Sequence, residues 1–376
     1  MKILIDARFW GLENSGLGRY TMNLVDNLIT LDNINNYTIL LRKKYFNLLN
    51  FPSNWEKIQT DFKHYTVAEQ IKLPKIISTQ KSDIVHFPHF NIPIFYKGKF
   101  VITIHDLIMH KFRGTKTTTL PAPLYLLKRS AYLYAFSNAV RRAEKIIVPS
   151  DFVKQQLQKS YKLSEDKIKV IYEGVDQRPK LTTSRLSVLK KYNLHSQYFI
   201  YTGNAYPHKN LSRALEAIVE LNKNSRQKIL FAIVSSRNVF TKRLEKIIND
   251  LNAKEFVKLL GFVPDNELTL LYKESLGFVY PSLMEGFGLP GLEAMAAGTL
   301  LLGSDIPVFR EIYKKNIVYF NPYDYTAIKK AMQSVLELDD KTREGVIENG
   351  RKFVKNYSWS KMAQQTLKVY ETALSQ

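Results

Sequence analysis

Short apolar runs alternate along the chain with longer stretches in which apolar residues recur at helical spacing. In the first half, these runs are rich in Ile and Val and lie at residues 2–7, 37–41, 83–87, 100–106 and 145–150. Their length is typical of buried strands, and the periodic stretches between most of them predict helices that cover a sheet. The alternation therefore predicts an α/β fold with a parallel sheet.

The same alternation restarts in the second half of the chain. Its apolar runs lie at residues 198–203, 228–236, 256–262, 276–282 and 299–305. We therefore expect two doubly wound α/β domains, an N-terminal one over 1–173 and a C-terminal one over 174–355. Ligands of open α/β sheets bind beyond the carboxyl ends of the strands, so two such domains are expected to face each other across a cleft.

The boundary between the two predicted domains lies at Glu173–Pro179, where glycine, aspartate and proline interrupt the pattern just after a strand. The final residues, 356–376, predict an amphipathic helix. Its apolar side includes Met362, Leu367 and Tyr370. The pattern leaves two positions for this helix open, one on the second domain and one that crosses back to the first.

Size and charge add to this picture. At 376 residues, the chain exceeds the size at which a single core usually stops growing, which also favours two domains. Its net charge is +21, and both halves carry more Lys and Arg than Asp and Glu. This charge favours anionic partners such as nucleic acid, acidic lipid or phosphorylated substrates, although a lysine-rich soluble surface explains it equally well.

The sequence also indicates a compartment. It contains no apolar run of about 18 residues and no signal-like start, so we expect neither a spanning helix nor secretion. It contains no cysteine, which excludes disulfides and thiolate metal sites and agrees with a reducing compartment. We therefore expect a cytoplasmic protein.

The segment SLMEGFGLPGLEAMAAG, residues 282–298, combines two acids with a glycine-rich turn. A strand is expected to end before it, and Pro290 suits the first position of a helix with Glu293 in its first turn. Gly286 and Gly288 let the backbone approach a ligand, and the helix N-terminus attracts an anion such as pyrophosphate. Alternatively, Glu285 caps a loop and Glu293 only complements the helix dipole.

Two further loops of this kind follow predicted strands. In residues 201–218, Gly203 and Pro207 precede Lys209 at a helix entrance, where its charge suits a phosphate; alternatively, Asn210 caps the helix and Lys209 is solvated. In residues 7–24, Gly16 and Gly18 come between the first strand and a helix, where glycine also suits a tight turn. Together the three loops favour a ligand with phosphates held across a cleft.

These segments carry a family resemblance. The Glu285–Glu293 spacing in its glycine-rich context is similar to the signature of retaining, nucleotide-sugar-dependent glycosyltransferases of family 4, group 1. Further matches occur in the family's order and cover nearly the whole chain. They are SGLGRYTMNL at 15, HFPHFNIP at 86, HDL at 105, VPSDF at 148, EGVD at 173, TGNAYPHKNL at 202, GFVPDNEL at 261 and SDIPVFREI at 304. The resemblance implies the GT-B fold, two Rossmann-like domains facing across a cleft.

The resemblance also implies roles for individual residues. Glu285 contacts hydroxyls of the donor sugar, and Glu293 hydrogen-bonds the ribose of the nucleotide. Lys209 neutralises the diphosphate. The loop after Glu285 brings backbone to sugar and phosphate oxygens through Gly286, Phe287, Gly288 and Leu289.

Three further positions follow from the same resemblance. Many relatives carry an arginine where this chain has Asn204, so the second positive charge on the diphosphate comes from elsewhere or is absent; Arg237 is a candidate substitute. His105 corresponds to a histidine near the donor sugar, although a structural histidine is equally compatible with its place at a strand end. Gly16 and Gly18 correspond to a loop near the phosphates and the acceptor.

The implied chemistry is transfer with retention of anomeric configuration. Fixed amides and Lys209 act where negative charge develops on the leaving diphosphate. The leaving phosphate takes the acceptor's proton, so no side chain is assigned as a base. The sequence shows no Asp-x-Asp at a strand end, and we expect neither a metal nor another cofactor.

The resulting prediction is a hexosyltransferase with mannose from GDP-mannose as the favoured donor and a surface-polysaccharide or lipid-linked glycan as acceptor. The alternatives are a GT-B nucleotide-sugar epimerase and a basic nucleic-acid-binding protein. The second alternative rests on charge alone, because the sequence shows no recognised nucleic-acid-binding module. The basic, aromatic segment 126–145 is expected to pack its aromatic side chains inward. The alternative is that it lies on an anionic membrane surface, which would place the enzyme peripherally on the inner face of the cell membrane.

Overall fold

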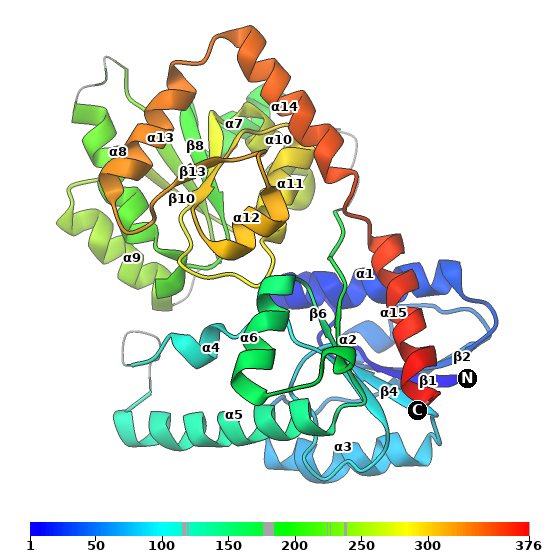
Figure 1. Ribbon diagram of the computed structural model, residues 1–376. Helices are drawn as coiled ribbons and strands as arrows, with labels where there is room; N and C mark the ends of the chain where they lie inside the picture. Colours follow the sequence, from blue (N-terminus) through cyan, green and yellow to red (C-terminus); the bar gives the residue numbers. More distant parts are fainter. Residues whose placement is uncertain are drawn as a thin grey trace. The chain divides into compact units, whose positions relative to one another are not determined.

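The computed structural model describes residues 1–114, 118, 120–175, 184–223, 225, 227–236 and 239–375 (Figure 1). Part of the expected interdomain boundary and the candidate cation Arg237 lie outside these residues. The chain divides into two compact units. Unit 1 comprises Met1–Gly174 and Tyr357–Gln376, and unit 2 comprises Val175–Asn356.

Unit 1 is built on a seven-stranded sheet in the order β3-β2-β1-β4-β5-β6-β7, with every neighbouring pair parallel. The central strands are buried along almost their whole length because helices cover both faces of the sheet. The strands are β1 (Lys2–Asp6), β2 (Asn36–Leu41), β3 (Trp55–Gln59), β4 (Ile84–Phe87), β5 (Phe100–Thr103), β6 (Lys145–Val148) and β7 (Ile168–Val170).

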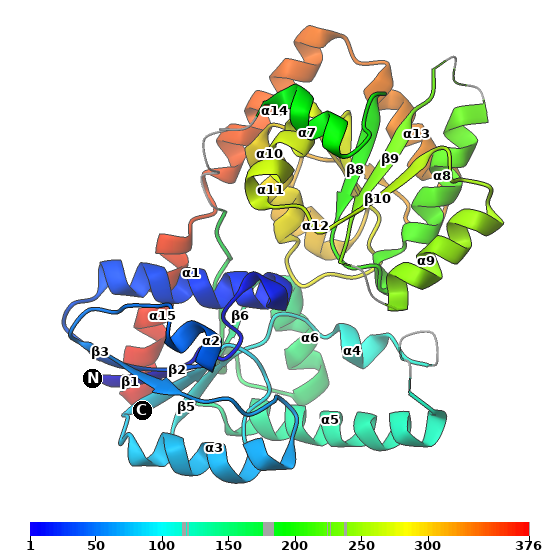
Figure 2. The same cartoon turned by 180° about the vertical axis from the view of Figure 1, so that it is seen from behind.

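The helices of unit 1 form two layers, with α1 and α15 on one face of the sheet and α3 and α5 on the other (Figures 1 and 2). Helix α15 packs along α1, although more than 300 residues separate them in the sequence. The helices are α1 (Ser15–Leu31), α2 (Lys43–Phe46), α3 (Val67–Thr79), α4 (Ile108–Lys111), α5 (Ala122–Arg142), α6 (Asp151–Tyr161) and α15 (Trp359–Leu374).

Unit 2 repeats the architecture with a six-stranded parallel sheet in the order β10-β9-β8-β11-β12-β13. Helix α8 packs on α13, and α11 packs on α10 and α14. The strands are β8 (Tyr198–Thr202), β9 (Leu230–Val234), β10 (Val257–Gly261), β11 (Gly277–Tyr280), β12 (Leu301–Ser304) and β13 (Val318–Phe320). The helices are α7 (Arg185–Lys191), α8 (Leu211–Lys223), α9 (Val239–Asp250), α10 (Asp265–Glu274), α11 (Leu289–Ala297), α12 (Pro307–Tyr313), α13 (Tyr325–Leu336) and α14 (Asp340–Val354).

The strand orders confirm the predicted pair of doubly wound domains. In each sheet the chain adds strands outward on one side of its first strand and then continues on the other side. The direction changes between β1 and β4 in unit 1 and between β8 and β11 in unit 2. Loops that leave the carboxyl ends of such a pair diverge and expose a binding position between them.

Two strands, β3 and β13, are absent from the predicted set, and β7 is predicted only as the strand that precedes the boundary at Glu173. All three lie at sheet edges, and each is only partly buried. An edge strand has one unpaired side and needs no continuous apolar run, so its sequence carries little signal.

A polar network inside unit 1 joins α15 to the sheet. His86 on β4 contacts the Tyr370 hydroxyl through Nδ1 at 2.6 Å and the Thr103 hydroxyl through Nε2 at 2.9 Å. Tyr20 on α1 reaches the same threonine at 3.0 Å. Burial holds the pKa of His86 at about 3, so its imidazole is neutral at physiological pH.

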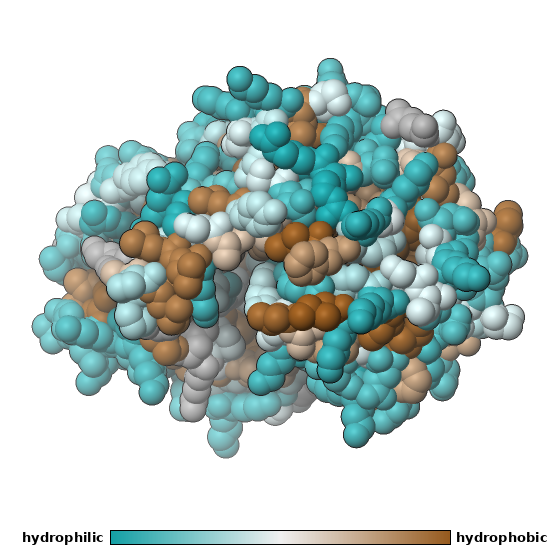
Figure 3. Space-filling model, turned by 90° about the horizontal axis from the view of Figure 1, so that it is seen from below, coloured by the Kyte–Doolittle hydropathy of each residue, from teal (hydrophilic) through white to brown (hydrophobic). Residues whose placement is uncertain are grey.

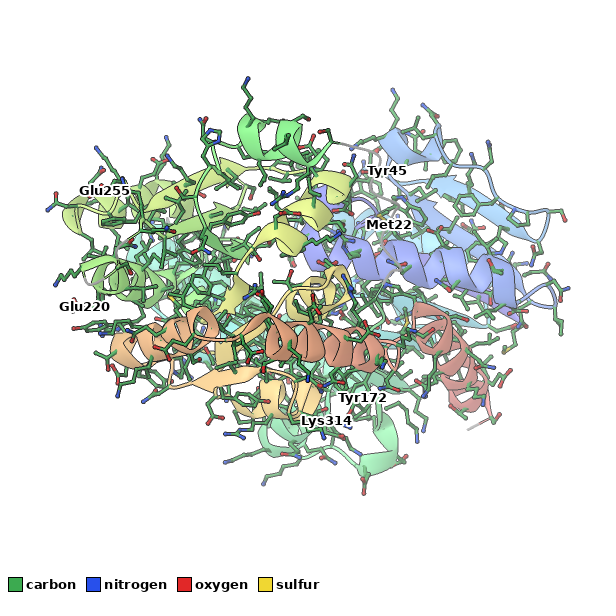
Figure 4. All side chains as sticks on the ribbon, turned by 90° about the horizontal axis from the view of Figure 1, so that it is seen from above. Met22, Tyr45, Tyr172, Glu220, Glu255 and Lys314 are labelled. Carbon is green, nitrogen blue, oxygen red and sulfur yellow. The ribbon has the colours of Figure 1, made fainter. Side chains whose placement is uncertain are left out.

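The segments that lead to and from unit 2 also meet in unit 1. Tyr172, which follows β7 and is labelled in Figure 4, packs against Tyr357, with ring centroids 5.9 Å apart. The backbone of Ser358 and Trp359 lies where a Cβ on Gly174 would be, so only glycine fits this approach.

Candidate functional site

The loops after β8 and β11 are fixed to each other at the switch point of unit 2. Asn210 has left-handed backbone geometry, and its side-chain amide donates to the carbonyl oxygens of Pro281 at 3.0 Å and Pro322 at 2.7 Å. The amide of Leu283 donates to the His208 carbonyl at 2.8 Å. Asn210 therefore ties together three loops that leave the carboxyl edge of the sheet.

This arrangement places Lys209 against Glu285. Their Nζ and Oε1 atoms are 2.6 Å apart, and their side chains are only 13% and 8% exposed. Burial raises the pKa of Glu285, but the charge and hydrogen bond of Lys209, together with His208 and Ser282, outweigh burial and the net pKa is lowered. The loops therefore hold an ionised carboxylate and an ammonium group in a largely dehydrated position, so Lys209 is not a solvated residue.

The glycine-rich turn after Glu285 is supported by a tyrosine from α12. Gly288 has a φ of 107°, in the left-handed region, and its carbonyl accepts a hydrogen bond from the buried Tyr313 hydroxyl. A Cβ on either Gly288 or Gly291 would collide with that hydroxyl. Both glycines are thus required by the close approach of Tyr313.

Glu293 lies deeper in its helix than the sequence predicts. Helix α11 begins at Leu289 rather than Pro290, so Glu293 is its fifth residue and belongs to the second turn. The side chain is buried rather than exposed beside the helix N-terminus. The prediction that it falls in the first turn is therefore wrong, because the turn at Gly288 starts the helix one residue earlier.

Asn204 takes part in the turn after β8. Its carbonyl oxygen accepts from the Tyr201 hydroxyl at 2.9 Å, and its Oδ1 accepts from the Tyr206 amide at 3.4 Å. In the sequence of the two loops, residues 203–210 and 281–289, Lys209 is the only lysine or arginine. Asn204 therefore shapes this loop without adding a positive charge.

In unit 1, Gly16 and Gly18 lie inside the first turn of α1 rather than in the loop that precedes it. A Cβ on Gly18 would collide with the carbonyl of Gly11, whereas one on Gly16 would meet open space. The loop before α1 is fixed by Tyr45, labelled in Figure 4, whose hydroxyl donates to the Glu13 carboxylate at 2.7 Å. The two glycines therefore have different structural roles.

His105 follows β5 and uses both ring nitrogens within unit 1. Nδ1 is 3.2 Å from Glu173 Oε1, and Nε2 is 3.0 Å from the Pro88 carbonyl oxygen. Burial lowers the pKa of His105, but the hydrogen bond and charge of Glu173 outweigh burial, and the net pKa is raised. Both neighbours are acceptors, so only the imidazolium form donates to both. The carboxylate of the neighbouring Asp106 accepts a hydrogen bond from the Ile108 backbone amide at 2.8 Å.

Two family models match the chain and together cover most of both units. The description "Glycosyltransferase Family 4" matches residues 15–178, and "Glycosyl transferases group 1" matches residues 189–353. The chain belongs to the family 4, group 1 glycosyltransferases. The resemblance inferred from the motifs is thus confirmed.

Curated relatives of this glycosyltransferase include two O-antigen enzymes. It is 28% identical to O-antigen chain mannosyltransferase RfbU of Salmonella typhimurium, over 80% of this chain and 76% of that protein. It is 29% identical to O-antigen chain mannosyltransferase B of Escherichia coli, over 77% of this chain and 74% of that protein.

Solved structures confirm the GT-B fold of the glycosyltransferase. Anabaena Alr3699/HepE, in complex with UDP and glucose, matches with a TM-score of 0.72 at 17% identity, over 99% of each chain. At this identity the likeness speaks for the fold alone.

Tyr313 and Asn210 are the residues of the glycosyltransferase site whose contacts the sequence did not indicate. Tyr313 acts on a turn 25 residues earlier in the chain. The only available signal is the i, i+4 spacing of Phe309 and Tyr313, which puts both rings on one face of α12. The sequence predicts only a helix-capping role for Asn210, whose partners Pro281 and Pro322 lie on other loops.

In the described parts of the glycosyltransferase, no group of three or more histidine, aspartate or glutamate side chains is arranged to hold a metal ion. Metal independence stays a prediction. Within the same ranges, no helix has both the length and the apolarity to cross a bilayer.

Proposed function

We propose that this glycosyltransferase transfers mannose from GDP-mannose to a glycan or lipid-linked oligosaccharide during synthesis of a surface polysaccharide such as O-antigen, lipopolysaccharide or capsule. The observation that carries the proposal is the buried Lys209–Glu285 pair beside the turn at Gly288. Its position at the switch point of unit 2 suits a ligand with sugar and phosphate groups. The names of the two O-antigen relatives support mannose and the polysaccharide acceptor.

Each group of the donor has a proposed partner in unit 2. Glu285 accepts from sugar hydroxyls, and Glu293 accepts from ribose hydroxyls. The amides of Phe287, Gly288 and Leu289 hold sugar and phosphate oxygens at the positive end of the α11 dipole. The Lys209 ammonium has three donors, so it can hold Glu285 and a phosphate oxygen together.

The proposed reaction retains the anomeric configuration. The bond from the anomeric carbon to the β-phosphate oxygen breaks, and the acceptor oxygen forms the new bond on the same face of the sugar. The acceptor's proton passes to the leaving phosphate. Lys209 and the α11 N-terminus stabilise the negative charge that develops there, so the proposal requires neither a metal nor a protein base.

Three residues of unit 1 are proposed to take part in the same reaction. Gly16 and Gly18 place the amides of the first turn of α1 where a long helix attracts an anion. His105, whose pKa Glu173 raises despite burial, is proposed to lie close to the donor sugar.

The first experiment is thermal unfolding of the full chain with GDP, UDP, dTDP or ADP, each with and without EDTA. A ligand of the folded state at about 100 times its Kd adds roughly 2.7 kcal/mol of stability. We expect GDP to raise the Tm, EDTA to leave the shift unchanged, and Lys209→Ala to remove it. A Tm shift with UDP alone would refute the GDP assignment. If none of the four nucleotides raised the Tm, the proposed function would be contradicted.

Transfer is tested separately with radiolabelled GDP-mannose and membranes that carry lipid-linked glycan. We expect label in the glycan only when acceptor membranes are present. A nucleotide-sugar epimerase, the alternative function, would release an altered free sugar without any acceptor.

We propose further that the enzyme works in the cytoplasm, peripherally on the inner face of the cell membrane. The support is chemical, because a lipid-linked acceptor presents its glycan at that surface.

A further inference from the structure

Helix α5 exposes large apolar side chains over its first half. The residues of α5 that are buried, Phe136, Ala139 and Val140, all lie toward its C-terminal end. The exposed apolar residues of α5 and the neighbouring α4 have exposed fractions between 42% and 68%. They are Met109, Leu124, Leu126, Leu127 and Tyr134, here called the apolar patch. The prediction that this segment packs its aromatic side chains inward therefore holds for Phe136 and is wrong for Tyr134.

Apart from Leu126, which lies about 80° around the helix axis from the buried Phe136, the α5 residues of the patch lie on the side of α5 that faces away from the protein core. At roughly 100° per residue, Leu127 lies about 180° and Tyr134 about 160° around the helix axis from the buried Phe136. Leu124, Leu127 and Tyr134 follow the spacing of one helical stripe. A helix that only covers a domain places polar side chains there, so this stripe is not explained by the packing of unit 1.

Helix α4 is held against α5, which makes the patch continuous across both. The Arg129 guanidinium donates to the Met109 carbonyl at 3.0 Å and to the His110 carbonyl at 3.3 Å. The Tyr132 hydroxyl is 2.7 Å from His110 Nδ1. These contacts place Met109 beside the first half of α5. Figure 3 shows hydrophobic side chains among hydrophilic ones on the face of unit 1 that bears α3 and α5.

The surroundings of the patch are basic. No aspartate or glutamate occurs between Asp106 and Glu144. Arg129 and Arg142 are engaged by backbone carbonyls, whereas Lys111 and Lys128 are exposed beside the patch. A segment that is both apolar and basic is complementary to a surface that offers hydrocarbon and negative charge together.

We propose that the apolar patch docks unit 1 onto an anionic lipid bilayer surface. The leucines, Met109 and Tyr134 enter the boundary between headgroups and acyl chains, and Lys111 and Lys128 contact lipid phosphates. An amphipathic helix that lies in the membrane interface does not need the length of a membrane-spanning helix. This inference deepens the proposed function. It rests on that function in one respect, because a lipid-linked acceptor would be found at the bilayer surface.

The test is sedimentation of the full chain with vesicles of phosphatidylglycerol and phosphatidylcholine, or of phosphatidylcholine alone. We expect binding to the mixed vesicles that weakens as salt is added. Leu127→Ser with Tyr134→Ser should weaken binding at least about tenfold, because two exposed apolar side chains lose their contact with lipid. Lys111→Glu with Lys128→Glu should weaken binding to the mixed vesicles alone.

The matched control is Ile34→Ser with Leu48→Ser, which removes two apolar side chains at least as exposed, in the same unit but outside α4 and α5. This control should bind vesicles like the wild type. Wild-type protein that ignores the mixed vesicles would overturn the proposal and favour a protein partner. A patch variant that binds as well as the wild type would also overturn it.

The GDP-dependent rise in Tm, measured without lipid, separates this inference from the proposed function. The patch variant should keep that rise, because its substitutions lie outside unit 2. Vesicle binding without a GDP effect would leave the docking surface intact and reject the donor assignment. A GDP effect without vesicle binding would do the reverse.

Discussion

At the scale of single residues, the site of unit 2 depends on a few side chains whose charges and hydroxyl groups are buried. The Lys209–Glu285 pair combines two ions that would be costly to bury separately. Asn210 and Tyr313 hold the loops that carry this pair and the adjacent turn. Substitutions here therefore change ligand binding and stability together, and both must be measured.

The two glutamates are expected to have separable roles. Glu285→Gln should abolish transfer and leave GDP affinity nearly unchanged, and Glu293→Gln should weaken GDP binding directly. Loss of the buried charge partner of Lys209 should also cost on the order of 3 kcal/mol of stability. Isothermal titration with GDP and transfer assays, both on the same folded samples, distinguish the roles of the two glutamates. The opposite pattern would show that the roles are exchanged.

Tyr313→Phe tests whether the tyrosine positions the turn. The substitution keeps the ring but removes one donor to the Gly288 carbonyl, for a loss of about 1 kcal/mol. If this hydrogen bond serves to hold the turn in its ligand-binding geometry, the whole loss should appear in the free energy of GDP binding, and GDP affinity should drop roughly fivefold. Tyr319→Phe is the control, because its hydroxyl donates to Phe309 and Lys314 instead. Equal GDP affinity in both variants would give Tyr313 a purely structural role.

At the scale of helices and strands, the sequence predicts the central parts of both sheets. Ten apolar runs correspond to β1, β2, β4, β5, β6, β8, β9, β10, β11 and β12. The missed strands β3 and β13, like β7, which is predicted only from its place before Glu173, are partly exposed edges where burial does not force an apolar run. The motif loops follow strand ends as the sequence predicts, but the helix starts at Ser15 and Leu289 depend on local turns that periodicity does not resolve.

The start of α1 offers a pair of matched glycines. Gly18→Ala should cost about 1–3 kcal/mol, because the new methyl group collides with the Gly11 carbonyl. Gly16→Ala meets open space and should stabilise the helix by about 0.5–1 kcal/mol. Urea unfolding at neutral pH compares the two. If the two variants were equally stable, the approach of α1 to Gly11 would not constrain the fold.

The docking of α15 should make unit 1 sensitive to acid. The folded pKa of His86 is about 3 against 6.5 in the unfolded chain, so the unfolded state binds a proton first as pH falls. This stability is complete above pH 6.5 and is lost as the pH falls toward 3, by about 2 kcal/mol at pH 5. In urea unfolding at pH 7 and pH 5, His86→Gln should reduce this difference. His195→Gln, at an exposed position, should leave it unchanged.

At the scale of the whole molecule, the chain consists of two units that each have a sheet and a core of their own. The last helix returns to unit 1, so unit 2 is inserted between two segments that meet near Gly174. The positive charge is spread over the sequence of both halves. Each unit is therefore large enough to unfold cooperatively by itself.

Calorimetry of the full chain should show two transitions, and GDP should raise only the one that belongs to unit 2. The ligand's proposed partners with the strongest charge, Lys209 and Glu285, are both in that unit. Lys209→Ala identifies the transition by removing the shift. A single transition that GDP moves as a whole would mean that the units unfold together.

The sequence by itself determined the α/β class, the division into two domains, the family and the loops that carry the candidate site. These features are local, because strand runs, helical periodicity and glycine-rich turns are written in neighbouring residues. Only the tertiary structure decided that α15 joins unit 1, that Tyr313 supports Gly288 and that α5 exposes its leucines. Periodicity shows that a side chain can be buried, but the partner that buries it comes from distant parts of the chain.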